Sequence, residues 1–227
     1  MTFTDTTRPL TATVAGTADT EAETETETAP HPAVRRRWWV VALREPFLAA
    51  TWRRVAYLLL ALPVSLLCVP LALAGGPAGR VQRGLARRLL GLDIPAPPRT
   101  GAFALAHAVL SLPLNLIAAM VTVYGWSLVP LNFGWPLRPV LGMGTADPSQ
   151  DWGGPTFAGA WAVHAVGGGV TFLLLMPWLG RGLTALQGRL AAALLGTSRA
   201  GVLKAAGLAV LVAAVGAALS VPIIHQL

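Results

Sequence analysis

Long apolar runs without charge dominate the second half of the chain. No charged residue lies between Thr100 and Leu137, and none lies between Trp152 and Gly180. Each run exceeds the roughly 20 residues that cross a hydrocarbon core as a helix. Such a run must be helical in lipid, because no water there satisfies the backbone polar groups. The pattern therefore predicts an all-α integral membrane protein.

These runs and their surroundings predict a complete helical hairpin module over residues 100–196. Its two apolar segments, residues 101–130 and 157–180, are joined by a Gly-, Pro- and Trp-rich loop at residues 131–156. A basic amphipathic helix over residues 181–196 follows, with leucines in one stripe and arginines off it. We expect the loop to lie outside the cell and the amphipathic helix to lie inside.

Two further apolar segments flank this hairpin. Residues 200–224 predict a C-terminal transmembrane helix, whose alanines recur every four residues and suit close packing against another helix. Residues 55–79 are also long enough to span, but Pro63 and Pro70 each remove a helix hydrogen bond. Basic clusters lie at both ends of this segment, and one crossing would place one cluster outside, against the positive-inside tendency. We therefore expect three transmembrane helices plus one short, broken or re-entrant apolar segment.

An internal repeat accounts for the unusual first segment. Residues 56–63 align with residues 106–113, and residues 81–91 align with residues 186–196. The first copy, residues 55–92, lacks a stretch about as long as one external loop plus one returning helix. It ends in a basic amphipathic helix that we expect to lie in the membrane interface. Because internal repeats commonly build membrane proteins, we interpret this copy as a shortened first membrane module that starts and ends inside.

Composition and charge agree with a membrane protein. Of the 227 residues only 12% are charged, whereas soluble domains carry about 25%. Residues 1–33 hold six of the ten acids and almost no large apolar side chain, which predicts a disordered acidic tail. Residues 34–54 combine six arginines with three tryptophans, as expected of a basic juxtamembrane segment that meets anionic headgroups of the lipid bilayer.

The charge distribution also sets the expected topology. The basic flanks favour a multi-pass protein of the cell membrane with a cytoplasmic N-terminus and an extracytoplasmic C-terminus. The net charge of +7 does not indicate nucleic-acid binding, because the arginines flank apolar spans and do not form an aromatic-interleaved patch.

The loop supplies the candidate sensing residues, which are Trp135, Asp147, Asp151 and Trp152. The two acids lie four residues apart and could bind a cation, but we favour plain turn residues in this Gly/Pro context. The tryptophans could line a ligand pocket, but we favour an aromatic belt at the outer interface.

Two histidines, His107 and His164, lie within apolar segments, where an ionisable residue is a functional candidate. No acid at membrane depth pairs with them, and two histidines alone make a poor metal site. We therefore favour interhelical hydrogen bonding or placement at the membrane interface for both, over a proton-relay or metal role. Cys68 is the single cysteine and should be a buried, inert thiol. We predict no catalytic, cofactor-binding or metal-binding residue, and no cofactor.

Four short stretches carry a family resemblance. They are residues 52–63, 84–91, 151–154 and 177–196, within roughly residues 45–196. They resemble the actinobacterial sensor domain that stands at the amino end of many membrane histidine kinases and sometimes stands alone. In that family both halves form full hairpins, whereas the first half here is shortened. The last apolar segment is not part of the family pattern, and no kinase domain follows.

The resemblance implies a non-enzymatic, stand-alone membrane sensor or regulatory domain. Its expected partner is a histidine kinase or another membrane protein, and self-association is a further candidate. The alternative is a small transporter or permease component, which predicts polar groups along the helices; besides the two histidines, Ser111, Asn115 and Thr122 stand out. A membrane-embedded enzyme is a third hypothesis, which the absence of acids from the spans disfavours.

Overall fold

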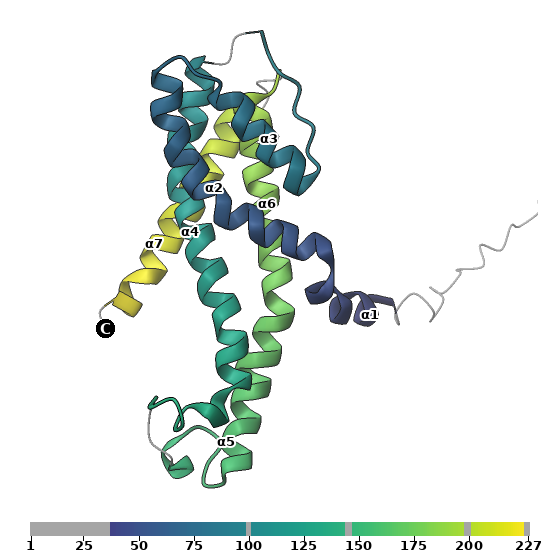
Figure 1. Cartoon of the computed structure of the whole chain (residues 1–227), viewed down its shortest axis with the longest axis vertical. Coiled ribbons are helices and arrows are strands. Elements are labelled where there is room, and N and C mark those ends of the chain that lie inside the picture. The colour runs from purple at the N-terminus through teal and green to yellow at the C-terminus, as the bar shows by residue number, and fades with distance from the viewer. Residues whose placement is uncertain (1–36, 99–100, 144–146, 198–200, 225–227) are drawn as a thin grey trace, which may run out of the picture. The chain divides into compact units, whose positions relative to one another are not determined.

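The computed structural model describes residues 37–98, 101–143, 147–197 and 201–224, and every regular element within them is a helix (Figure 1). The predicted acidic tail, residues 1–33, lies outside the described residues. Three of the described helices are long and apolar enough to cross a membrane. The predicted all-α fold of a membrane protein is therefore confirmed.

Four helices precede the hairpin. They are α1 (Arg37–Arg44), the short 3-10 helix η1 (Glu45–Phe47), α2 (Ala49–Leu73) and α3 (Ala78–Leu90). A glycine turn ends α2, because Gly75 adopts a φ of 73° and the N–H of Gly76 donates to the carbonyl of Leu71 at 2.8 Å. This turn reverses the chain, so α3 packs back along α2.

The hairpin consists of α4 and a long return helix. Its elements are α4 (Gly101–Phe133), the loop helices η2 (Trp135–Leu137) and η3 (Pro148–Gln150), and a return helix made of α5 (Phe157–Val163), the π-helix η4 (His164–Val170) and α6 (Thr171–Leu195). The last helix is α7 (Val202–Ile224), which packs against α4 and α6. Figure 1 shows α4 and α6 side by side, with the loop at one end.

The apolar segment at residues 55–79 differs from its prediction. It forms most of α2, a helix of 25 residues that continues through both internal prolines. Pro63 and Pro70 are exposed, and the loss of one hydrogen bond at each does not end the helix. The expectation of a short or broken helix is therefore wrong, whereas a re-entrant path stays a prediction.

The two amphipathic stretches also take different forms. α3 is a separate helix that exposes Arg80 and Arg87 and buries Gln82. Residues 181–195, in contrast, continue α6 without a break, and their leucine stripe packs between α4 and α7. The predicted C-terminal helix is present as α7, whose described apolar part, Ala206–Gly216, is shorter than a span.

α2 runs antiparallel to α4. Ser65 lies 3.2 Å from Ser111 between their hydroxyl oxygens, whereas the earlier residue Ala61 accepts a hydrogen bond from the later residue Asn115. Trp52, still earlier, lies against Trp126 with ring centroids 4.8 Å apart. α2 therefore covers the part of α4 that precedes residue 126.

The register divides the hairpin into two halves. We define the proximal half as residues 101–118 of α4 with residues 181–195 of α6, and the distal half as residues 119–133 with residues 157–180. The buried apolar clusters lie in the proximal half and in the helices that cover it, α2, α3 and α7, with Ile94 from the linker before α4. The apolar core of the described chain is therefore built on one half of the hairpin.

Candidate functional site

The first candidate site residue, Trp135, closes the loop end of the distal half. It directly follows α4 and is buried, and its ring stacks on His164 with centroids 5.2 Å apart. Phe157 at the start of α5 lies 5.1 Å from the same ring. The indole N–H of Trp161 donates to the carbonyl of Phe133 at 3.1 Å. Trp135 therefore belongs to an aromatic contact between α4 and the return helix, and does not face outward as in a belt.

The other three loop candidates are not gathered into one site. Asp147 is exposed and caps η3, where its Oδ1 accepts hydrogen bonds from the backbone N–H and the hydroxyl of Ser149 (2.9 and 2.7 Å). These bonds from the Ser149 hydroxyl and N–H lower the pKa of Asp147. Asp151 accepts the N–H of Gly154 through its own backbone carbonyl, and Trp152 is 83% exposed. Asp147 is thus a turn residue, as favoured from the sequence.

A buried polar cluster in the proximal half is the strongest candidate site. Its members come from α2, α3, α4 and α6, and we name Ser65, Gln82, His107, Ser111, Asn115 and Gln187 the polar cluster. Gln187 donates through Nε2 to Oδ1 of Asn115 at 2.6 Å, and Asn115 donates through Nδ2 to the hydroxyl of Ser65 at 2.7 Å. Hydrogen bonds thus connect three helices in a region where an unpaired buried amide costs about 1–3 kcal/mol.

A small cavity lies among these side chains. Its volume is about 20 Å³, and its lining contains no carboxylate. Both polar atoms of the Gln82 amide, Nδ1 of His107 and Oε1 of Gln187 are buried without a hydrogen-bond partner. A cavity of roughly 10–15 Å³ with two to four polar partners accommodates one water molecule. The cavity therefore suits a ligand the size of water that bridges α3, α4 and α6.

The predicted repeat relates residues that face one another across this cavity. At an offset of 50 residues, Tyr57 corresponds to His107 and Ser65 to Asn115; at an offset of 105, Gln82 corresponds to Gln187. The two contacts between α2 and α4, Ser65–Ser111 and Ala61–Asn115, exchange under the same offset. α2 and α4 thus meet through reciprocal contacts at equivalent positions of the repeat, an approximate two-fold relation between these two helices.

Sequence reasoning found only part of this cluster. His107, Ser111 and Asn115 stand out as polar residues in an apolar run, but Ser65, Gln82 and Gln187 do not. A serine is unremarkable in a membrane helix, and the glutamines lie in amphipathic segments that already carry polar residues. The signal that could have found the glutamines is their equivalent position in the repeat.

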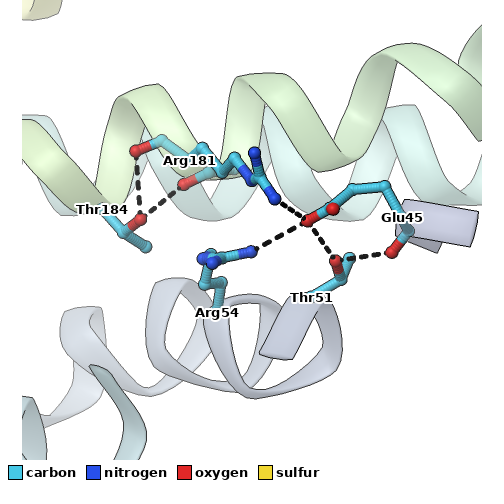
Figure 2. Close-up of polar contacts among 6 residues, drawn as sticks. Glu45, Thr51, Arg54, Arg181 and Thr184 are labelled. Atoms are coloured by element: carbon cyan, nitrogen blue, oxygen red, sulfur yellow. Dashed lines mark hydrogen bonds and ion pairs between the residues drawn. The ribbon is translucent and has the colours of Figure 1, made fainter. Parts of the chain in front are cut away.

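A second polar arrangement joins the start of α2 to α6. The Glu45 side chain is buried, and its Oε1 accepts from a guanidinium N–H of Arg181 at 2.6 Å and from one of Arg54 at 3.2 Å (Figure 2). The hydroxyl of Thr51 donates to the backbone carbonyl of Glu45 at 2.7 Å. We name Glu45, Arg54 and Arg181 the charged cluster; the sequence analysis did not identify Glu45, because its partner Arg181 is 136 positions away in the chain.

No protein family, curated protein or solved structure matches the chain. The resemblance to the actinobacterial sensor domain therefore stays a prediction.

Proposed function

We propose that this chain is a non-enzymatic membrane domain that senses or regulates, and that it acts through a partner protein. The carrying observation is the polar cluster, whose hydrogen bonds join the loop-bearing hairpin to α2 and whose cavity is also lined by Gln82 of α3. His164 lies on the same continuous return helix as Gln187, and Trp135, which stacks on it, begins η2 just after the end of α4, the helix that carries Asn115. A shift of α4 against α6 at the loop end would thus change the surroundings of Gln82.

The unpaired amide supports a role in switching. Gln82 has both polar atoms buried without partners, whereas Asn115 and Gln187 already bond to each other. A small displacement gives Gln82 new partners, so two packings of α3 can differ by a few kcal/mol or less. The opposite face of α3 exposes Arg80, Arg87 and Arg88, which a partner protein or anionic surface can contact.

Cross-linking in native membranes followed by purification of the full chain tests this proposal. We expect to recover a histidine kinase or another membrane protein, and we expect less of it with an Arg80→Gln, Arg87→Gln variant. The matched control is Arg189→Gln, an exposed arginine on α6. As a control, an unrelated membrane protein is cross-linked and purified in the same way. The proposal is contradicted if this chain recovers no protein that the control does not also recover. Recovery of the chain alone as an oligomer supports self-association instead.

For topology we propose the cell membrane, with a cytoplasmic N-terminus and the loop at residues 131–156 outside. The test is labelling of cysteines introduced at Thr7 and at Ser149, with Cys68 replaced by alanine. Only the second should react from outside. Reaction of both would mean that α2 crosses fully. Because α2 packs antiparallel to α4, a full crossing would place the start of α2 on the same side of the membrane as the loop after α4. An extracytoplasmic C-terminus requires α7 to cross as well and stays a prediction.

Transport of a water-sized species is the second candidate function. Its supporting observation is the approximate two-fold relation between α2 and α4 beside a polar cavity lined by an imidazole, since inverted repeats around a central site build many transporters. The volume of about 20 Å³ restricts the cargo to water or protons. Proteoliposomes should then show water or proton flux that falls in a Gln82→Leu variant. Flux equal to that of empty liposomes eliminates this candidate.

A further inference from the structure

A basic pocket opens beside the charged cluster. It has a volume of about 350 Å³. Its polar lining comes from α2 and α6, and its apolar wall from the end of α3: the residues are Arg53, Arg54, Arg181, Thr184, Leu89 and Leu92. Two helices that are distant in sequence thus present three guanidinium groups to one hollow.

The pocket carries excess positive charge. Within residues 37–98, 101–143, 147–197 and 201–224, Glu45 is the one acid that pairs with its arginines, and it pairs with Arg54 and Arg181 together. No acid lines the pocket, and Arg53 has no ion pair within the described part of the chain. Three cations with one anion beside them leave about two positive charges, which attract an anion most strongly where water is partly excluded.

The arginines are held in fixed positions. Glu45 is only 1% exposed, and its bonds to Arg54 and Arg181 set both guanidinium groups (Figure 2). Arg181 also lies over the ring of Trp178, 4.8 Å from its centroid. Each guanidinium has five N–H donors, of which the bonds to Glu45 use few. The remaining edges can hold phosphate oxygens in the paired geometry that arginine favours.

The pocket also lies where phosphate groups occur. Arg181 directly follows the apolar residues 157–180 of the return helix, at the boundary of the distal half. The ends of apolar membrane segments lie at the level of the lipid headgroups. We propose that the basic pocket binds a phosphate group, carried by an anionic lipid headgroup or by a free phosphate ion. The inference depends on the proposed membrane placement and not on the proposed signalling role.

The test compares lipids on the purified full chain in detergent. Native mass spectrometry counts bound phosphatidylglycerol and phosphatidylcholine, and inorganic phosphate is added as a competitor. We expect at least about tenfold preference for phosphatidylglycerol and its loss in Arg53→Gln, an arginine outside the ion pairs, since hydrogen bonds to a charged group are among the stronger ones and tenfold corresponds to about 1.4 kcal/mol. Arg181→Gln should act likewise. The matched control is Arg88→Gln, an exposed arginine that does not line the pocket.

The outcomes show whether the bound phosphate group belongs to a lipid headgroup or to a free phosphate ion. Loss of phosphatidylglycerol in Arg53→Gln with no effect of millimolar phosphate identifies a lipid headgroup. Full competition by inorganic phosphate identifies a free phosphate site. Equal binding by wild type, Arg53→Gln and Arg88→Gln overturns the inference, because general surface charge would then explain all binding. Since the assay needs no partner protein, failure here leaves the signalling proposal untouched, and failure of co-purification leaves this site untouched.

Discussion

The proximal and distal halves of the hairpin use the same two helices but hold them together differently. In the proximal half, Gln187 of α6 donates a buried hydrogen bond to Asn115 of α4, and α2, α3 and α7 cover the pair. In the distal half, α4 and α6 meet where Gly125 leaves room for Met176. The proximal half combines its apolar clusters with buried polar bonds between helices, whereas the distal half has close contacts at glycines and the exposed bond from Trp161 to the Phe133 carbonyl.

This difference shows which end of the hairpin is fixed. Buried hydrogen bonds require one register, because a shift leaves amides unpaired. Contacts at glycines have no such directionality, and the distal return helix also contains the π-helix His164–Val170 with three successive glycines. We expect the loop end to adjust while the polar cluster keeps the register, which is the arrangement that a loop-driven signal requires.

Length adds a constraint on membrane placement. α4 has 33 residues, so it extends for about 50 Å, whereas a hydrocarbon core is about 30 Å thick. The two halves therefore cannot both lie wholly within the core. The distal half has no charged residue, whereas the proximal half exposes Arg189. We expect the distal half to occupy the core and the charged cluster to mark its boundary.

Membrane depth should show the largest contrast between the halves. A spin label at Val166, exposed in the distal half, should collide with oxygen and not with a water-soluble nickel reagent in nanodiscs. A label at Leu67, exposed on α2 beside the proximal half, should be several-fold more accessible to the nickel reagent. Both variants carry Cys68→Ala. The reverse pattern would place the proximal half in the core and require α2 to cross.

The second contrast is energetic. Asn115→Leu removes hydrogen bonds to Ser65, Gln187 and the Ala61 carbonyl. At about 0.6–1 kcal/mol each, the free energy of unfolding should fall by about 2–3 kcal/mol. Thr122→Val is the matched control, because that buried hydroxyl bonds only within its own helix, to the Ala118 carbonyl. Unfolding in a denaturing detergent measures both. Equal losses would show that the polar cluster does not hold the proximal half.

In the distal half, substitutions at glycines should lower the free energy of unfolding by less than Asn115→Leu does. The effect should also depend on whether the glycine lies against another side chain. A Cβ at Gly169 would lie 3.0 Å from the ring of Phe133, whereas a Cβ at Gly167 would meet nothing within 4 Å. Gly169→Val should therefore cost about 1–2 kcal/mol of unfolding free energy, and Gly167→Val should cost clearly less. The same detergent assay compares them. Indistinguishable variants would mean that the distal helices do not pack as closely as the structure shows.

The sequence was sufficient for the helices and insufficient for their contacts. Apolar runs predict α4 and the return helix because burial in lipid demands helices of that length, whereas α7 forms where expected but has a described apolar part shorter than a span. α2 differs from its prediction because Pro63 and Pro70 are exposed, and the loss of one hydrogen bond at each does not end the helix. Trp135 was taken for a belt residue, but its position against His164 depends on how the loop folds back.

Local sequence patterns do not predict the polar cluster or the charged cluster, and the reason is physical. Gln187 and Asn115 are separated by 72 positions, so their bond depends on helix register that no local pattern reveals. In the sequence, Glu45 is one acid among juxtamembrane arginines. Its ion pair with Arg181 forms only because α6 packs beside it in the fold. Only the repeat carried long-range information, since it places Gln82 and Gln187 at equivalent positions.

The smallest effect should come from the turn in the loop, which lies outside both halves. Hydrogen bonds from the hydroxyl and N–H of Ser149 lower the pKa of Asp147. A lowered pKa in the folded state stabilises the turn above the ordinary pKa of aspartate, and this contribution is lost as pH falls through the lowered pKa.

Ser149→Ala should raise the pKa of Asp147 only partly, because the backbone N–H still donates, whereas Ser149→Thr should keep it low. Carbon-13 NMR titration of the side-chain carboxyl measures the shift. An unchanged pKa in Ser149→Ala would contradict the hydroxyl's role, and a changed unfolding free energy of the hairpin would show that the loop turn is coupled to the helices.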